Sequence, residues 1–123
     1  MKQAKILLVE DDVDLANVYK MRLVAENFNV KWTENGEDAL AQTVKFAPDL
    51  ILLDLMMPRI SGFDVLDILR NTPETKNVKI IVISALSQKD QIDKAMKLGA
   101  NEYLVKAQTT IEQVVEKIRT LLA

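Results

Sequence analysis

Acidic residues follow two apolar runs of the chain at the points where those runs end. Glu10, Asp11 and Asp12 come directly after the run ILLV, and Asp54 follows the run LILL. Carboxylate oxygens without histidine or cysteine favour a hard cation, Mg²⁺ or Mn²⁺. A carboxylate can also be a nucleophile that forms an aspartyl-phosphate. If these acids meet, their residue types predict metal-assisted phosphoryl chemistry.

Two further polar residues end apolar runs in the second half of the chain. Ser84 follows the run IIVI, and Lys106 follows YLV. Phosphoryl transfer needs its developing negative charge covered by a metal, an ammonium group and a hydroxyl donor. The chain therefore contains each group that this reaction requires.

Structural roles compete with this interpretation at every position. Asp12 stands just before a helical pattern, where an N-cap is the favoured role. Asp54 alone fits a surface loop, Ser84 fits a hydroxyl bonded to its own turn, and Lys106 fits a solvated side chain. Only the meeting of all of them at one edge of a sheet favours the functional interpretation.

The runs and the segments between them predict the elements that bring these residues together. Runs that are apolar on both faces suit parallel strands covered on both sides, whereas the alternating segment 29–33 suits an edge strand. Segments with helical period separate the runs, so the pattern is β-α five times. It predicts an α/β fold with a doubly wound, five-stranded parallel sheet of order 2-1-3-4-5, flavodoxin-like, whose ligands bind beyond the carboxyl ends of strands 1 and 3.

Apolar residues at helical spacing define five stripes, and small polar residues mark helix ends. Gly99 fits the end of the fourth helix, and Thr109 or Thr110 fits the cap of the fifth. The stripes comprise Leu15, Val18, Tyr19 and Leu23; Ala39, Leu40, Thr43 and Val44; Phe63, Leu66 and Leu69; Ile92, Ala95 and Met96; and Ile111, Val114, Val115, Ile118 and Leu122.

The length, net charge and amino-acid composition of the chain exclude several classes of protein. With 123 residues, the chain fits one domain over 1–123, and we expect no output domain in it. The net charge of −2 and the lack of a basic stripe argue against nucleic-acid binding. There is no cysteine, signal peptide or membrane-length apolar run, which fits a cytoplasmic protein. There is also no histidine, so any phosphohistidine donor is another protein.

Four fragments in order resemble the response-regulator receiver family of two-component signalling, the CheY-like superfamily. They are KILLVEDD at 5–12, PDLILLDLMMPRISGFDVL at 48–66, KIIVISA at 79–85 and GANEYLVK at 99–106. The resemblance covers essentially the whole chain and implies a phosphoacceptor switch rather than an enzyme. Such a protein catalyses only its own phosphorylation and dephosphorylation.

The resemblance implies a role for each residue of the predicted site. Asp54 matches the phosphoacceptor, and Lys106 and Ser84 match the groups that bind the phosphoryl oxygens. Tyr103 matches the aromatic residue that turns inward when the hydroxyl moves. Mg²⁺ would be held by Asp11, Asp54 and the backbone carbonyl of Met56, with Glu10 acting through water.

Three positions near the predicted site concern its loops. Pro58 and Gly62 match the residues that shape the loop after the third strand. Ala107 departs from the family, which commonly has a cis-proline after the lysine. A cis bond before alanine is far less favourable than before proline, so the sequence leaves a strained cis bond and a trans path both open.

The resemblance also implies partners. A sensor histidine kinase or a histidine phosphotransfer protein would donate the phosphoryl group. The surface of the fourth helix, fifth strand and fifth helix would then shift to control a downstream protein partner, and a homodimer through that surface is possible. We expect no nucleic-acid or membrane contact through this domain.

Three other classes compete with this prediction. A receiver-like binding module that works without phosphorylation is disfavoured by the intact Asp11, Asp54 and Lys106. A haloacid dehalogenase-type hydrolase would have D-x-D-x-T after its first strand. A flavodoxin-like cofactor protein would need a phosphate-binding loop there, in place of acids that repel phosphate.

Overall fold

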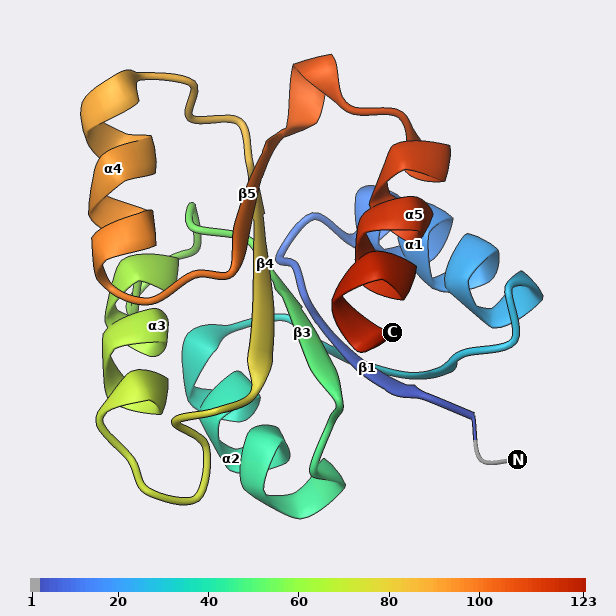
Figure 1. The fold of residues 1–123 in the computed structure, drawn as a ribbon, viewed down its shortest axis with the longest axis horizontal. Coiled ribbons are helices and arrows are strands. Elements are labelled where there is room, and N and C mark those ends of the chain that lie inside the picture. The colour runs from blue at the N-terminus through green and yellow to red at the C-terminus, as the bar shows by residue number, and fades with distance from the viewer. Residues whose placement is uncertain (1–2) are drawn as a thin grey trace.

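The computed structural model describes residues 3–123, which form five parallel strands alternating with helices (Figure 1). The strand order is β2-β1-β3-β4-β5, which confirms the predicted doubly wound sheet. In this order β1 and β3 are neighbours in the interior of the sheet. The strands are β1 Lys5–Val9, β2 Asn29–Thr33, β3 Leu50–Leu53, β4 Lys79–Ser84 and β5 Glu102–Val105.

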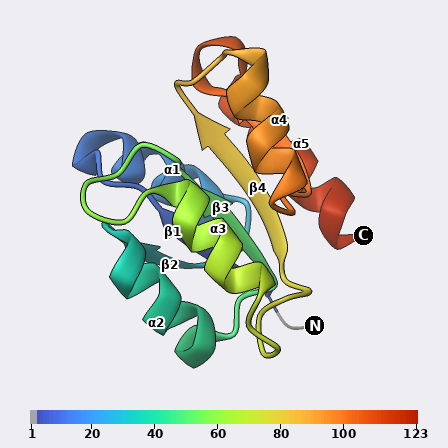
Figure 2. The ribbon, with the colours of Figure 1, turned by 90° about the vertical axis from the view of Figure 1, so that its left-hand side faces the viewer.

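Five helices cover the two faces of the sheet (Figures 1 and 2). Helices α1 and α5 pack on one face, and α2, α3 and α4 pack on the other, so each face has its own apolar core. A short 3₁₀ turn, η1, connects β5 to α5. The helical elements are α1 Val13–Ala25, α2 Gly36–Phe46, α3 Gly62–Arg70, α4 Lys89–Lys97, η1 Lys106–Gln108 and α5 Ile111–Leu122.

The burial of the strands follows from their place in the sheet. All four residues of β3 are buried, because helices cover both faces of this central strand. In β2 the exposed Asn29 and Lys31 alternate with less exposed neighbours, as an edge strand requires. The apolar pattern thus predicted both the central strands and the edge strand.

Three helix ends lie at residues that the sequence indicated. Asp12 is the N-cap of α1, and its Oδ1 accepts a hydrogen bond of 3.2 Å from the Leu15 amide. Of the two threonines before α5, Thr110 is the N-cap, in a capping box with Gln113. Gly99 has a φ of 111° directly after the C-cap of α4, a backbone region in which glycine is favoured.

Three members of the apolar stripes are exposed. Val18, Val44 and Met96 are 55%, 63% and 42% exposed, respectively. Each lies beside the buried face of its helix, because a stripe read from spacing alone is wider than the strip that the sheet covers. Within residues 3–123, no helix has the length and apolar character needed to cross a membrane.

Candidate functional site

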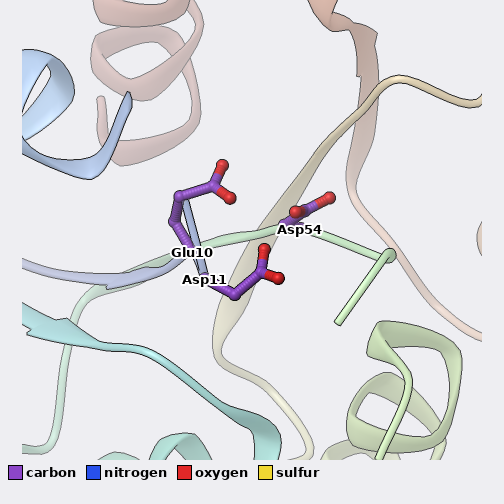
Figure 3. A group of neighbouring side chains, drawn as sticks. All are labelled: Glu10, Asp11 and Asp54. Carbon is purple, nitrogen blue, oxygen red and sulfur yellow. The ribbon is translucent and has the colours of Figure 1, made fainter. Parts of the chain in front are cut away.

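Three carboxylates from β1 and β3 meet at the carboxyl edge of the sheet (Figure 3). Glu10, Asp11 and Asp54 each have a carboxylate oxygen within 4.8 Å of the others. The strand register explains the meeting, since Val9 of β1 pairs with Leu53 of β3 and the acids follow within two residues. The predicted acidic cluster is therefore present, with Glu10 and Asp54 buried and Asp11 exposed.

Glu10 is held from several directions although it is only 1% exposed. Its Oε1 accepts a hydrogen bond of 2.9 Å from Lys106 Nζ, and its Oε2 accepts one of 3.2 Å from the Asp12 amide. Burial raises the pKa of the Glu10 carboxyl, and the nearby charge of Asp54 raises it further. Lys106 opposes both effects, so the site has two buried acids for one ammonium group.

Asp54 presents its two carboxylate oxygens to different partners. Oδ1 accepts a hydrogen bond of 3.2 Å from the Met56 amide, within its own loop. Oδ2 lies 3.4 Å from Lys106 Nζ. The side chain is only 4% exposed, so it is held at the end of β3 with one oxygen toward the ammonium group.

Lys106 reaches both acids from the first residue of η1. Its own burial lowers the pKa of the ammonium group, but the hydrogen bond to Glu10 and the charge of Asp54 outweigh that effect and raise it. The Lys106–Ala107 bond is trans, as are all the peptide bonds of residues 3–123. Of the two paths that the sequence left open, the chain takes the trans one, and Lys106 still reaches the site.

Ser84 and Tyr103 are linked through the loop after β4. Ser84 is fully buried, and its Oγ accepts a hydrogen bond of 3.2 Å from the Leu86 amide, which is the turn bond considered as its structural role. The hydroxyl of the half-buried Tyr103 donates a hydrogen bond of 2.8 Å to the Leu86 carbonyl. Leu86 thus connects the two predicted switch residues.

Gly62 is required where the loop after β3 folds back toward the end of that strand. Its amide donates a hydrogen bond of 2.9 Å to the Leu55 carbonyl. A Cβ at this position would overlap the Asp54 carbonyl oxygen and lie 2.5 Å from the Leu55 Cα. The exposed Pro58 lies in the same loop. This close approach gives the predicted shape-setting glycine its physical reason.

Two contacts at the site were not predicted from the sequence. The Trp32 indole Nε1 donates a hydrogen bond of 2.9 Å to the Glu10 carbonyl, which fixes the end of β1. Trp32 lies in the alternating edge strand and is partly buried. Because an indole N–H that is removed from water needs an acceptor, the tryptophan itself was the sequence feature that could have indicated this contact. Thr109 was considered only as a helix cap, but it bonds to the backbone on both sides of Lys106.

The donor set fits a hard divalent cation. The clustered atoms are all carboxylate oxygens, and Lys106 supplies one positive charge against three acids. Mg²⁺ is typically held by one or two carboxylates and retains several waters, which suits a site with one exposed acid at its mouth. An acidic pocket able to bind such a metal is therefore present.

Comparison with known proteins gives matches over nearly the whole chain. Residues 6–119 match the family model described as the response regulator receiver domain. The response regulator ArlR of Staphylococcus aureus is 39% identical over 120 residues, which are 96% of this chain and 52% of that protein. The chain thus spans about half the length of the curated relatives that it matches.

Solved structures agree with the family match. A putative response regulator from Chloroflexus aurantiacus is 28% identical with a TM-score of 0.92, covering 98% of both chains. The chemotaxis protein CheY4 of Vibrio cholerae, at 24% identity and a TM-score of 0.91, shares the fold over 98% of this chain and 100% of its own. With the family match over residues 6–119, these likenesses show that the chain belongs to the response regulator receiver domains of two-component signalling.

Proposed function

We propose that this protein is a phosphoacceptor switch in which Asp54 receives a phosphoryl group from a phosphohistidine of another protein. The observation that carries the proposal is the setting of Asp54: a buried carboxylate at a strand end, beside two further acids, with one oxygen 3.4 Å from Lys106 Nζ. A carboxylate in contact with an ammonium group is placed to attack phosphorus while the charge that develops is covered.

In the transfer, an oxygen of Asp54 forms a bond to phosphorus as the phosphorus–nitrogen bond of the donor breaks. The donor imidazole nitrogen keeps the electron pair of that bond. This chain has no histidine, so a separate kinase or phosphotransfer protein supplies the donor. The protein would thereby catalyse only its own phosphorylation and the later hydrolysis.

The acids of the site would hold Mg²⁺, or Mn²⁺ in its place. Asp11, Asp54 and the backbone carbonyl of Met56 would be direct ligands, and Glu10 would act through water. When bound, the cation supplies positive charge that offsets the carboxylates and the incoming phosphoryl oxygens. Because Asp11 is exposed, a cation that it held would be accessible to an incoming donor.

Two side chains would exchange partners when phosphorus arrives. Lys106 Nζ, now bonded to Glu10 and Asp54, would pair with a phosphoryl oxygen. Ser84, whose Oγ accepts from the Leu86 amide, would donate to another phosphoryl oxygen. Both new contacts would stabilise the negative charge that the phosphoryl group adds.

The loop after β4 would transmit the change to the surface of α4, β5 and α5. Ser84 and Tyr103 both bond to Leu86, so a movement of the serine affects the packing of the tyrosine. A pre-existing equilibrium of that surface then shifts, and a downstream partner or a second copy of the chain binds the favoured state.

The phosphoryl group should hydrolyse slowly. Met56 and Leu86 stand beside Asp54 and Ser84, and both side chains are apolar. Neither offers a group that positions a water molecule for attack on phosphorus. Replacing Met56 with asparagine should therefore shorten the lifetime of the phosphorylated protein.

The proposal is tested by weighing the intact protein after incubation with a small-molecule phosphodonor, with and without Mg²⁺. We expect the wild type to gain one phosphoryl group only when Mg²⁺ is present. Asp54→Asn should gain none, whereas Asp64→Asn, at an exposed aspartate in the first turn of α3, should behave as the wild type. No gain in the wild type under any condition would favour a module that binds its partner without phosphorylation.

A further inference from the structure

Thr109 contacts the two peptide groups that flank Lys106. Its Oγ1 donates a hydrogen bond of 2.8 Å to the Val105 carbonyl, which belongs to the peptide before Lys106. Its amide donates a hydrogen bond of 3.4 Å to the Lys106 carbonyl, which belongs to the peptide after it. One residue therefore restrains the backbone on both sides of the Lys106 Cα.

This restraint matters because Lys106 must span from the end of β5 to acids that follow β1 and β3. Its Nζ lies 2.9 Å from Glu10 Oε1 and 3.4 Å from Asp54 Oδ2. A lysine stem is flexible, so the direction in which its backbone points sets where the ammonium group is found. The next residue, Ala107, has no ring to restrict φ, and both it and Gln108 are exposed.

We propose that Thr109 is a positioning residue for phosphoryl transfer, acting through Lys106. It closes the trans turn η1 and so directs the lysine toward Glu10 and Asp54. This inference rests on the proposed function, in which Lys106 covers the charge on the phosphoryl oxygens. Thr109 itself touches neither the acids nor the phosphoryl group.

The alternative is that Thr109 makes an ordinary local bond. A threonine hydroxyl often bonds to the carbonyl four residues earlier, without any role beyond the turn. Thr120 has the same kind of bond, of 2.9 Å, to the Glu116 carbonyl in the last turns of α5. Thr120 is therefore a matched control, because its bond resembles that of Thr109 and lies outside the site.

The test compares rates of Asp54 phosphorylation by a small-molecule donor with Mg²⁺, together with the thermal unfolding of each variant. Thr109→Val keeps the shape but lacks the hydroxyl, and we expect its rate to fall about tenfold, since an ångström of misplacement can cost up to about a hundredfold. Thr109→Ser should restore the wild-type rate, and Thr120→Val should leave it unchanged. A wild-type rate in Thr109→Val would overturn the proposal.

A double mutant separates positioning from a general loss of structure. In a Lys106→Ala background, Thr109→Val should cause no further loss of rate, because the group that it positions is gone. An equal loss in both backgrounds would show that Thr109 acts independently of Lys106, and would overturn the proposal.

A measurement without phosphorylation distinguishes failure of this inference from failure of the proposed function. The ammonium ¹H–¹⁵N signal of Lys106, assigned with Lys106→Arg, exchanges slowly with water while Nζ is held by Glu10. We expect this signal in the wild type and in Thr120→Val, and its loss in Thr109→Val. An unchanged signal in Thr109→Val would refute the positioning role, even if the wild type proves unable to accept phosphate.

Discussion

At the carboxyl end of the sheet one ammonium group serves two buried carboxylates, whereas at the amino end one guanidinium group reaches three acceptors. Lys106 Nζ bonds to both Glu10 and Asp54. Arg70 of α3 instead donates to the Gly99 carbonyl, the Lys76 carbonyl and Asn101 Oδ1, at 2.9, 3.0 and 2.9 Å. Negative charge is in excess at one end, whereas neutral oxygen acceptors surround a cation at the other.

From this difference we expect one end of the domain to determine function and the other to determine stability. Buried like charges destabilise a fold, and they persist where a cation or a reaction uses them. Satisfied donors and acceptors stabilise the connections between elements. The Asn101 side chain shows this at the amino end, since its Oδ1 also accepts a hydrogen bond of 2.8 Å from the Ile80 amide at the start of β4. We therefore expect substitutions at the carboxyl end to change phosphorylation and those at the amino end to change stability.

The largest expected effect is at the carboxyl end. Lys106→Ala should slow phosphorylation of Asp54 by about 10²–10³-fold, the range seen when one charge-stabilising donor is removed from a reaction site. The measurement is the rate of phosphoryl gain by intact mass. A rate within error of the wild type would contradict the expected difference between the two ends, because the lysine would then have only a structural role.

The next effect is at the amino end. Arg70→Ala should lower the free energy of unfolding by about 2 kcal/mol, because one part-buried and two exposed hydrogen bonds are lost. Denaturant unfolding measures this loss. The phosphorylation rate of the folded variant should stay at the wild-type value, and a reduced rate would show that the two ends are coupled.

A smaller effect should have opposite signs at the two ends. Asp54→Asn removes one of two buried like charges and should raise the free energy of unfolding by about 1 kcal/mol in the absence of Mg²⁺. Asp49→Asn is the matched change at the amino end, where Oδ2 accepts a hydrogen bond of 2.7 Å from the Lys5 amide. It should lower the free energy of unfolding by about 0.5 kcal/mol. If both substitutions lower the free energy of unfolding, repulsion between the buried carboxylates does not destabilise the carboxyl end.

The smallest effect concerns backbone strain, which the two ends share. Arg59, in the loop after β3, has a φ of 65°, and Ala47, before β3, has a φ of 50°. Glycine adopts this region without steric cost but loses more entropy on folding, so Arg59→Gly and Ala47→Gly should each stabilise by about 0.5 kcal/mol. Thermal unfolding of both variants measures this. Stabilisation of only one variant would show that the two ends differ in backbone strain as well as in charge.

The sequence predicted the parts of the molecule that depend on local pattern. Apolar runs predicted the strands, because parallel strands covered on both faces leave little choice of residue type. The repeated alternation of strand and helix predicted their order. The cap at Asp12 was likewise predicted, since its side chain satisfies a helix amide only at that position. The meeting of Glu10, Asp11 and Asp54 followed from topology alone.

The remaining features depend on contacts that the local sequence pattern does not show. The exposure of Val18 and Val44 is set by how much of each helix the sheet covers, which spacing does not reveal. The trans turn after Lys106 is accompanied by two hydrogen bonds from Thr109, which form only once the chain has turned. For the same reason, the pairing of Lys106 with Glu10 at a shorter distance than with Asp54 was not foreseen.

The most direct test of the account is to locate the modification after incubation with a phosphodonor and Mg²⁺. Borohydride converts an aspartyl-phosphate to homoserine, which peptide mass spectrometry assigns to one residue. We predict homoserine at position 54 in the wild type, and none there when Mg²⁺ is omitted. Homoserine at Asp11, or at another aspartate while Asp54 stays intact, would contradict the account.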